Sequence, residues 1–160
     1  MSRSGYVDDV EDNLAAGRWK AQVKSAIRGK RGQAFLRELA AAMDAMPVKE
    51  LIANELVSAE GQCCTIGVVC KARGVDVSAV DPEEPEQVAV AVGISHQMAA
   101  EIEYLNDELG YRYEKVVEEK PADGPHWHPG FRWDRVDEDP AERWKRMRAW
   151  VEKQLIKPEA

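Results

Sequence analysis

The chain has no long apolar run, little cysteine, and one stretch of twenty residues without an acid. None of its 160 residues falls in a run close to the roughly 20 apolar residues that span a bilayer. Residues 1–9 contain no apolar segment and end in two aspartates, so we expect no signal peptide. Three cysteines without such a signal indicate free thiols in a reducing compartment. We therefore expect a cytoplasmic protein without a membrane partner.

The composition is that of one ordinary globular domain. Hydrophobic residues make up 44% of the sequence and charged residues 32%, which is typical of proteins with a packed core. A chain of this length buries roughly two thirds of the surface that its unfolded form exposes. We expect a single domain over residues 1–160.

Charge is distributed unevenly around a net value of −7. Residues 18–37 contain seven basic residues and no acid, whereas residues 81–120 contain eleven acids and three bases. The basic residues are Arg18, Lys20, Lys24, Arg28, Lys30, Arg31 and Arg37. Such asymmetry indicates either a dipolar surface that orients a partner or two faces that attract each other within the fold.

Apolar periodicity and end signals predict six helices. The first spans about residues 9–28, the second 33–46 and the third 63–72, the last closed by Gly74. Two later helices are predicted to begin with the same box: an aspartate cap, a proline, and a glutamate three residues after the cap. These boxes start at Asp81 and at Asp139, and Ser95 is predicted to cap a helix between them.

Two segments with alternating polarity predict a β-hairpin inserted before the last helix. Residues 111–117 and 131–136 both alternate with a period of two, as half-buried strands do. Pairing them antiparallel places four aromatic residues on one face and charged residues on the other, where opposite charges could pair across the strands. The aromatic residues are Tyr111, Tyr113, Phe131 and Trp133. That face needs cover, which either the helices or a partner must supply.

The fold class that follows is mainly α: a compact bundle of about six helices with an inserted β-hairpin. The hairpin forms an insertion at about residues 111–136, which includes the proline- and aromatic-rich residues 121–133 (the aromatic loop).

The order of motifs resembles that of a family of small, uncharacterised helical proteins encoded by bacteriophages and prophages. The resemblance rests on a Gly-x-x-Cys-x-x-Gly helix (Gly61, Cys64, Gly67), a helix pair ending at Asn106-Asp107, residues 26–38, and a terminal helix with Trp144 and Trp150. It implies a phage gene product that works in a bacterial cytoplasm. It transfers no catalytic residue and no activity.

Metal and enzyme chemistry have weak support in the sequence. His126 and His128 flank Trp127, but Cys63, Cys64 and Cys70 do not have the paired spacing of zinc ligands. No arrangement of nucleophile, base and acid is recognisable. We expect no cofactor, no metal and no catalytic residue.

Nucleic-acid binding has two candidate segments. Residues 88–102 fit the spacing of a helix-turn-helix, but the would-be recognition helix is acidic and would be repelled by phosphate. We interpret it as a helix pair with a tight turn at Gly93. Arg28, Lys30 and Arg31 are the better candidates, because they cluster where two glycines predict a flexible loop with free backbone N–H groups.

The leading hypothesis is a non-enzymatic, phage-encoded binding protein that inhibits or modulates a host bacterial protein, such as a component of a defence system. Prolines stiffen the aromatic loop, so it can present a large area at little entropic cost. The candidate partner-binding residues are His126, Trp127, His128, Phe131 and Trp133. The acidic stretch 81–119 could mimic nucleic acid toward a basic host protein. The alternative is a small nucleic-acid-binding accessory protein that acts through residues 18–37.

Overall fold

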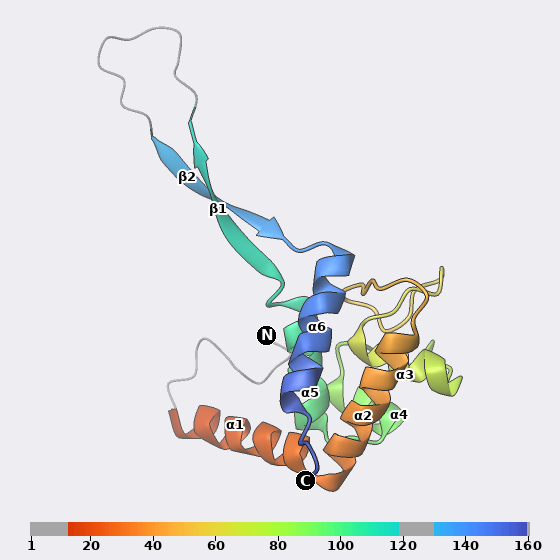
Figure 1. Ribbon diagram of the computed structural model, residues 1–160. Helices are drawn as coiled ribbons and strands as arrows, with labels where there is room; N and C mark the ends of the chain where they lie inside the picture. The colour runs from red at the N-terminus through yellow and green to blue at the C-terminus, as the bar shows by residue number, and fades with distance from the viewer. Residues whose placement is uncertain (1–12, 119–129, 160) are drawn as a thin grey trace, which may run out of the picture.

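The computed structural model describes residues 13–118 and 130–159. Over these residues the chain folds into six α-helices and one β-hairpin (Figure 1). The helices are α1 (Asn13–Arg28), α2 (Lys30–Ala45), α3 (Thr65–Arg73), α4 (Pro85–Val92), α5 (His96–Asp107) and α6 (Pro140–Gln154); the strands are β1 (Tyr111–Val117) and β2 (Phe131–Asp137). The predicted fold class is confirmed. None of the helices in the described ranges is both long and apolar enough to cross a membrane.

Helices α1 and α2 are joined by a single residue, Gly29, so the predicted flexible loop is wrong. Lys30 and Arg31 belong to the first turn of α2, which begins three residues earlier than expected. Gly32 explains the tight joint, because a Cβ there would overlap the Ala26 carbonyl oxygen. The buried Gln33 side chain donates to the carbonyls of Ile27 (2.8 Å) and Gln154 (3.0 Å), which connects the ends of α1 and α6 at this corner.

Helix α3 is buried over its first six residues and is capped from two sides. The Cys64 sulfur accepts a hydrogen bond from Gly67 N–H, and Gly67 packs so closely on the preceding loop that a Cβ would overlap the Leu56 carbonyl oxygen. Asn106 at the end of α5 supplies the second cap: its Oδ1 accepts from the backbone N–H (3.2 Å) and hydroxyl (2.7 Å) of Thr65. The glycine and cysteine motif is therefore a close-packing device.

One predicted capping box forms and the other does not. At α6, Asp139 and Glu142 each accept the other's backbone N–H, so the predicted box is confirmed. The predicted start at Asp81 is wrong, because α4 begins at Pro85. A helix started at Asp81 would place Pro85 at its fourth position, where the ring clashes with the Asp81 carbonyl and no N–H is available to bond it. Asp81 instead accepts the Glu83 N–H in a turn (2.8 Å).

The helix pair α4 and α5 turns at Gly93, which has a left-handed backbone (φ 77°), and Ser95 caps α5 as predicted. The apolar stripes of all six helices meet in one core. Its largest fully buried apolar side chains are Leu36, Leu39, Met43, Leu51, Ile66, Val69, Val88, Met98, Ile102, Met147 and Val151. Leu51 and Leu56 belong to the loop between α2 and α3, so this loop is part of the core.

Candidate functional site

The β-hairpin extends away from the helical bundle, as Figure 1 shows. Its strands pair antiparallel over their full length, from Tyr111 opposite Asp137 to Val117 opposite Phe131. This register places alternate residues of both strands on a common face, as the alternation predicted. The hairpin is the most exposed regular element of the described chain.

The aromatic face of the hairpin is not covered by the described helices. Tyr113 is 59% exposed, Phe131 56% and Trp133 60%, far above the values for rings that pack in a core. The sequence indicated that either the helices or a partner must cover this face, and the described helices do not cover it. These exposed rings make the hairpin face (Tyr111, Tyr113, Lys115, Val117, Phe131, Trp133, Arg135 and Asp137) the leading candidate site.

Aromatic and cationic side chains organise one another on the hairpin face. Tyr111 and Tyr113 pack edge to face with centroids 5.7 Å apart, and Phe131 and Trp133 do the same at 6.3 Å. The Lys115 ammonium lies 4.1 Å from the centre of the Phe131 ring. The Arg135 guanidinium lies 4.3 Å from the ring of Tyr111 and also pairs with Asp137 (3.0 Å). These contacts restrict the orientations of the four rings.

On the opposite face, ion pairs form along each strand rather than across the hairpin. Arg112 pairs with Glu114 (2.8 Å) and Arg132 with Asp134 (2.8 Å). The expected cross-strand pairing is wrong because the register sets Glu114 directly opposite Asp134. Each acid therefore takes the arginine two residues earlier on its own strand. Solvent screens all four groups, so this face contributes little to stability.

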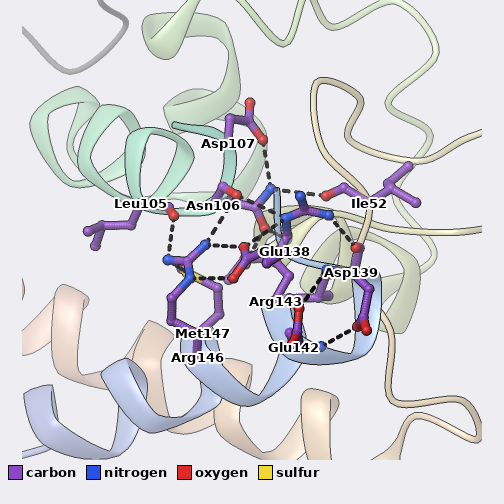
Figure 2. Close-up of polar contacts among 12 residues, drawn as sticks. Ile52, Leu105, Asn106, Asp107, Glu138, Asp139, Glu142, Arg143, Arg146 and Met147 are labelled. Carbon is purple, nitrogen blue, oxygen red and sulfur yellow. Dashed lines mark hydrogen bonds and ion pairs between the residues drawn. The ribbon is translucent and has the colours of Figure 1, made fainter. Parts of the chain in front are cut away.

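A network of buried ion pairs attaches the base of the hairpin to the bundle (Figure 2). Glu138 follows β2 and its side chain is only 9% exposed. It accepts hydrogen bonds from Arg146 Nε (2.8 Å) and Nη2 (2.5 Å) and lies 3.3 Å from Arg143 Nε. The Glu138 N–H donates to the Gly110 carbonyl at the start of β1 (2.8 Å). Both ends of the hairpin are thus held at one point.

The same two arginines bind the carboxyl end of α5. Arg146 donates to the carbonyl of Leu105 (2.6 Å), and Arg143 donates to the carbonyls of Asn106 (3.1 Å) and Leu51 (2.9 Å). The last carbonyls of a helix have no partner within it and carry partial negative charge, so guanidinium groups stabilise them. Glu138 offsets one of the two positive charges, and the partial negative charge of the helix end interacts favourably with both arginines. The network thereby sets where the hairpin leaves the bundle.

Sequence reasoning missed both Glu138 and Asn106. The sequence did contain a signal for Glu138. This acid directly precedes the capping box at Asp139, and Arg143 and Arg146 follow five and eight residues later, so all three side chains can meet at the first turns of α6. The sequence placed Asn106 only at the end of a helix pair; the structure shows that it caps α3 and also donates to the Ile52 carbonyl (3.0 Å).

The structure describes two of the five predicted partner-binding residues. Phe131 and Trp133 lie together on the hairpin face, whereas His126, Trp127 and His128 lie outside the described residues. The acidic stretch does not form one surface over its described part. Glu103 is buried and Glu114 is paired with Arg112, which leaves exposed acids mainly at the turn before α4.

The cysteines are structural. All three are free thiols and buried. Burial raises the pKa of each thiol above its ordinary value, which keeps Cys63, Cys64 and Cys70 protonated and unreactive at neutral pH. Within residues 13–118 and 130–159, no three or more His, Cys, Asp or Glu side chains gather in a group that could hold a metal ion.

The basic residues of segment 18–37 are exposed but separated. Arg28 ends α1, whereas Lys30 and Arg31 lie on the first turn of α2. Arg28 lines a groove between α1 and the end of α6 that Lys30 and Arg31 do not line. The three residues predicted to lie on one flexible loop therefore lie at a junction of two helices.

In comparisons with known proteins, no family model, no curated protein and no solved structure matches this chain.

Proposed function

We propose that this chain is a non-enzymatic, phage-encoded binding protein whose hairpin face docks onto a host bacterial protein and modulates it. The observation that carries the proposal is the exposed aromatic face on a hairpin held away from the bundle. The family resemblance of the sequence supports the phage setting, and a defence-system component is the class of host target we expect.

The chemistry of the hairpin face favours a protein partner. Tryptophan, tyrosine and arginine are the residues that contribute most to protein–protein affinity, and all three are present here. The two cations of the face, Lys115 and Arg135, are already engaged with aromatic rings, and Asp137 offsets one of them. The opposite face carries equal numbers of acids and arginines. A hairpin with so little net charge has weak attraction for a phosphate backbone.

Preorganisation supports the same conclusion. A two-stranded hairpin is only marginally stable by itself, and an exposed apolar face adds an aggregation hazard. Here the strands are ordered by edge-to-face rings and by the network at Glu138. Binding therefore costs little entropy for ordering the hairpin, so most of the free energy gained by burying the rings contributes to affinity.

The test is capture of host proteins by the tagged full-length chain from nuclease-treated bacterial lysate, compared between two double variants. Phe131→Ala/Trp133→Ala removes two exposed rings of the hairpin face. Arg132→Ala/Asp134→Ala removes an exposed ion pair from the opposite face of the same strand. We expect a stoichiometric host protein that the first variant fails to capture and the second retains. The captured protein is then purified and its affinity measured by calorimetry.

The expected loss for the first variant is at least about 2 kcal/mol of binding free energy, the contribution of one hot-spot ring, because such contributions do not add. Equal capture by both variants would place the interface elsewhere and overturn the role of the hairpin face.

A further inference from the structure

One edge of strand β2 pairs with no other strand of the described chain, because the sheet there consists of β1 and β2 alone. At the two ends of the hairpin, the Glu118 N–H donates to the Gly130 carbonyl (3.1 Å) and the Glu138 N–H to the Gly110 carbonyl (2.8 Å). Hydrogen-bonded residues alternate along an antiparallel ladder, so the even-numbered residues of β2 bond β1. The backbone N–H and C=O groups that point outward are those of Phe131, Trp133, Arg135 and Asp137.

Strand β2 lacks several features that usually prevent pairing between sheet edges. Natural edge strands are often interrupted by a proline or a bulge, or carry a lysine. Residues 131–137 contain no proline and no lysine, and their register with β1 continues without a bulge. The strand does carry four charged side chains. Whether a further strand can pair with this edge therefore depends on whether its charges match.

The charges of β2 match those of a second copy of β2 in one antiparallel register. When Trp133 lies opposite Trp133 of the second copy, Arg132 of each copy lies opposite Asp134 of the other. Both charged side chains are exposed, Arg132 by 60% and Asp134 by 42%, so they are accessible to a second strand. Cross-strand pairs of opposite charge and pairs of aromatic rings are both favourable. The twofold symmetry supplies two ion pairs around one pair of rings.

Other registers of the same two strands are unfavourable. A shift by two residues sets Asp134 opposite Asp134, or Arg132 opposite Arg132, and like charges directly opposite each other are destabilising. A shift by one residue sets the outward backbone groups of one copy opposite residues of the other whose groups already bond β1. The alternating charges of β2 therefore favour its own copy as partner, in a single register.

Strand β1 has the same charge pattern in Arg112 and Glu114, but its position is less suitable. Its matching register centres on Tyr113, two residues from the start of the strand, or about 7 Å from the bundle end of the hairpin. A second copy paired there would meet the bundle. Trp133 lies four residues from the end of β2, or about 13 Å. Arg112 also lies 3.7 Å from Glu142 of α6, so its charge is partly engaged.

We propose that two copies of this chain pair through their β2 edges, antiparallel about Trp133, to form a four-stranded sheet. The partner is thus a second copy of the chain, and the interface is the same surface on both copies. Residues opposite each other share a face of the sheet, so the two hairpin faces lie on the same side of the dimer. Each hairpin face is complete in one copy. The dimer therefore does not depend on a host protein, and docking to a host protein does not depend on the dimer.

The experiment measures the mass of the purified full-length chain by sedimentation equilibrium. The native mass should approach twice 17.9 kDa as concentration rises. Arg132→Asp and Asp134→Arg each set like charges opposite one another at two points of a homodimer. Each variant should raise the dissociation constant of the dimer at least about tenfold.

Mixing the two variants tests the register directly. In a dimer of one Arg132→Asp chain with one Asp134→Arg chain, both opposed pairs again carry opposite charges. An equimolar mixture should therefore dimerise more tightly than either variant alone. The double variant Arg132→Asp/Asp134→Arg should dimerise as the native chain does.

The matched control is Arg112→Glu, which reverses an exposed arginine two residues before an acid on β1. It should leave the dissociation constant unchanged. Far-UV circular dichroism checks that each variant is folded. No host protein is present in these measurements, so their outcome is separate from that of the capture test.

Three results would overturn the proposal. These are a native chain that remains monomeric at every concentration tested, an equal effect of Arg112→Glu and Arg132→Asp on the dissociation constant, or a mixture of the two β2 variants that dimerises no more tightly than either alone.

Discussion

Asn106 shows how one buried side chain can join three segments. Its amide accepts from the first residue of α3 and donates to the carbonyl of Ile52 and to the carboxylate of Asp107. Only 1% of the residue is exposed, so water cannot replace these partners. Each buried group left without a partner costs about 1–3 kcal/mol.

We expect Asn106→Ala to lower the free energy of unfolding by about 2–5 kcal/mol, since it leaves the N–H of Thr65 and the carbonyl of Ile52 unpaired. Urea denaturation followed by circular dichroism measures the change. The matched control is Gln22→Ala, which removes an exposed amide and should change stability by less than about 0.5 kcal/mol. A similarly small change for Asn106→Ala would show that the hydrogen bonds of Asn106 contribute little to the stability of the fold.

At the scale of the element, the hairpin depends on its base. Arg112 of β1 forms an ion pair with Glu142 of α6 (3.7 Å), but both side chains are exposed and solvent screens them. The network of Glu138, Arg143 and Arg146 is therefore the principal attachment of the hairpin. A buried ion pair becomes costly when one partner is removed, because the remaining charge is left without compensation.

Glu138→Gln should therefore loosen the hairpin and destabilise the protein by about 1–3 kcal/mol, below the fully buried case because Arg146 is 30% exposed. Hydrogen exchange with mass spectrometry should show faster exchange in peptides that cover residues 108–118 and 130–138, with little change in α2 and α3. Glu114→Gln, at an exposed position on β1, is the control and should leave exchange near the hairpin base unchanged. Faster exchange in α2 as well would indicate global destabilisation instead of a local attachment.

Across the whole molecule, two ion pairs connect α2 to its neighbours. Glu38 accepts from Arg73 of α3, and Asp44 accepts from Arg148 of α6. Each guanidinium lowers the pKa of its carboxyl below the ordinary value, chiefly by hydrogen bonding. A carboxyl with a lowered pKa in the folded state stabilises the fold above its unfolded pKa and loses that effect as pH falls through the folded value.

We expect stability to decrease as pH falls below about 4.5, with part of the loss due to these two pairs. Glu38 is 38% exposed and Asp44 54%, so screening limits each pair to less than about 1 kcal/mol. The variant Glu38→Gln/Asp44→Asn should be less stable than the native chain at pH 7, and the difference should vanish near pH 2. Urea denaturation at several pH values tests this; a difference independent of pH would exclude the ion pairs as its source.

Local signals in the sequence predicted most of the elements. The C-terminal ends of α1 and α3, the box at Asp139, the cap at Ser95 and the two faces of the hairpin were all predicted, because periodicity and capping act over a few residues. The box at Asp81 failed on a local conflict: Pro85 cannot occupy the fourth position of that helix.

The sequence by itself therefore determined which segments are helices and strands, and which residues share a face. Only the tertiary structure decided that the hairpin face is left uncovered, that Asn106 caps another helix, and that Arg143 and Arg146 connect the base of the hairpin to the end of α5. The physical reason is distance along the chain. These features depend on contacts between residues separated by tens of positions, and such contacts are set by how the helices pack, which no local pattern encodes.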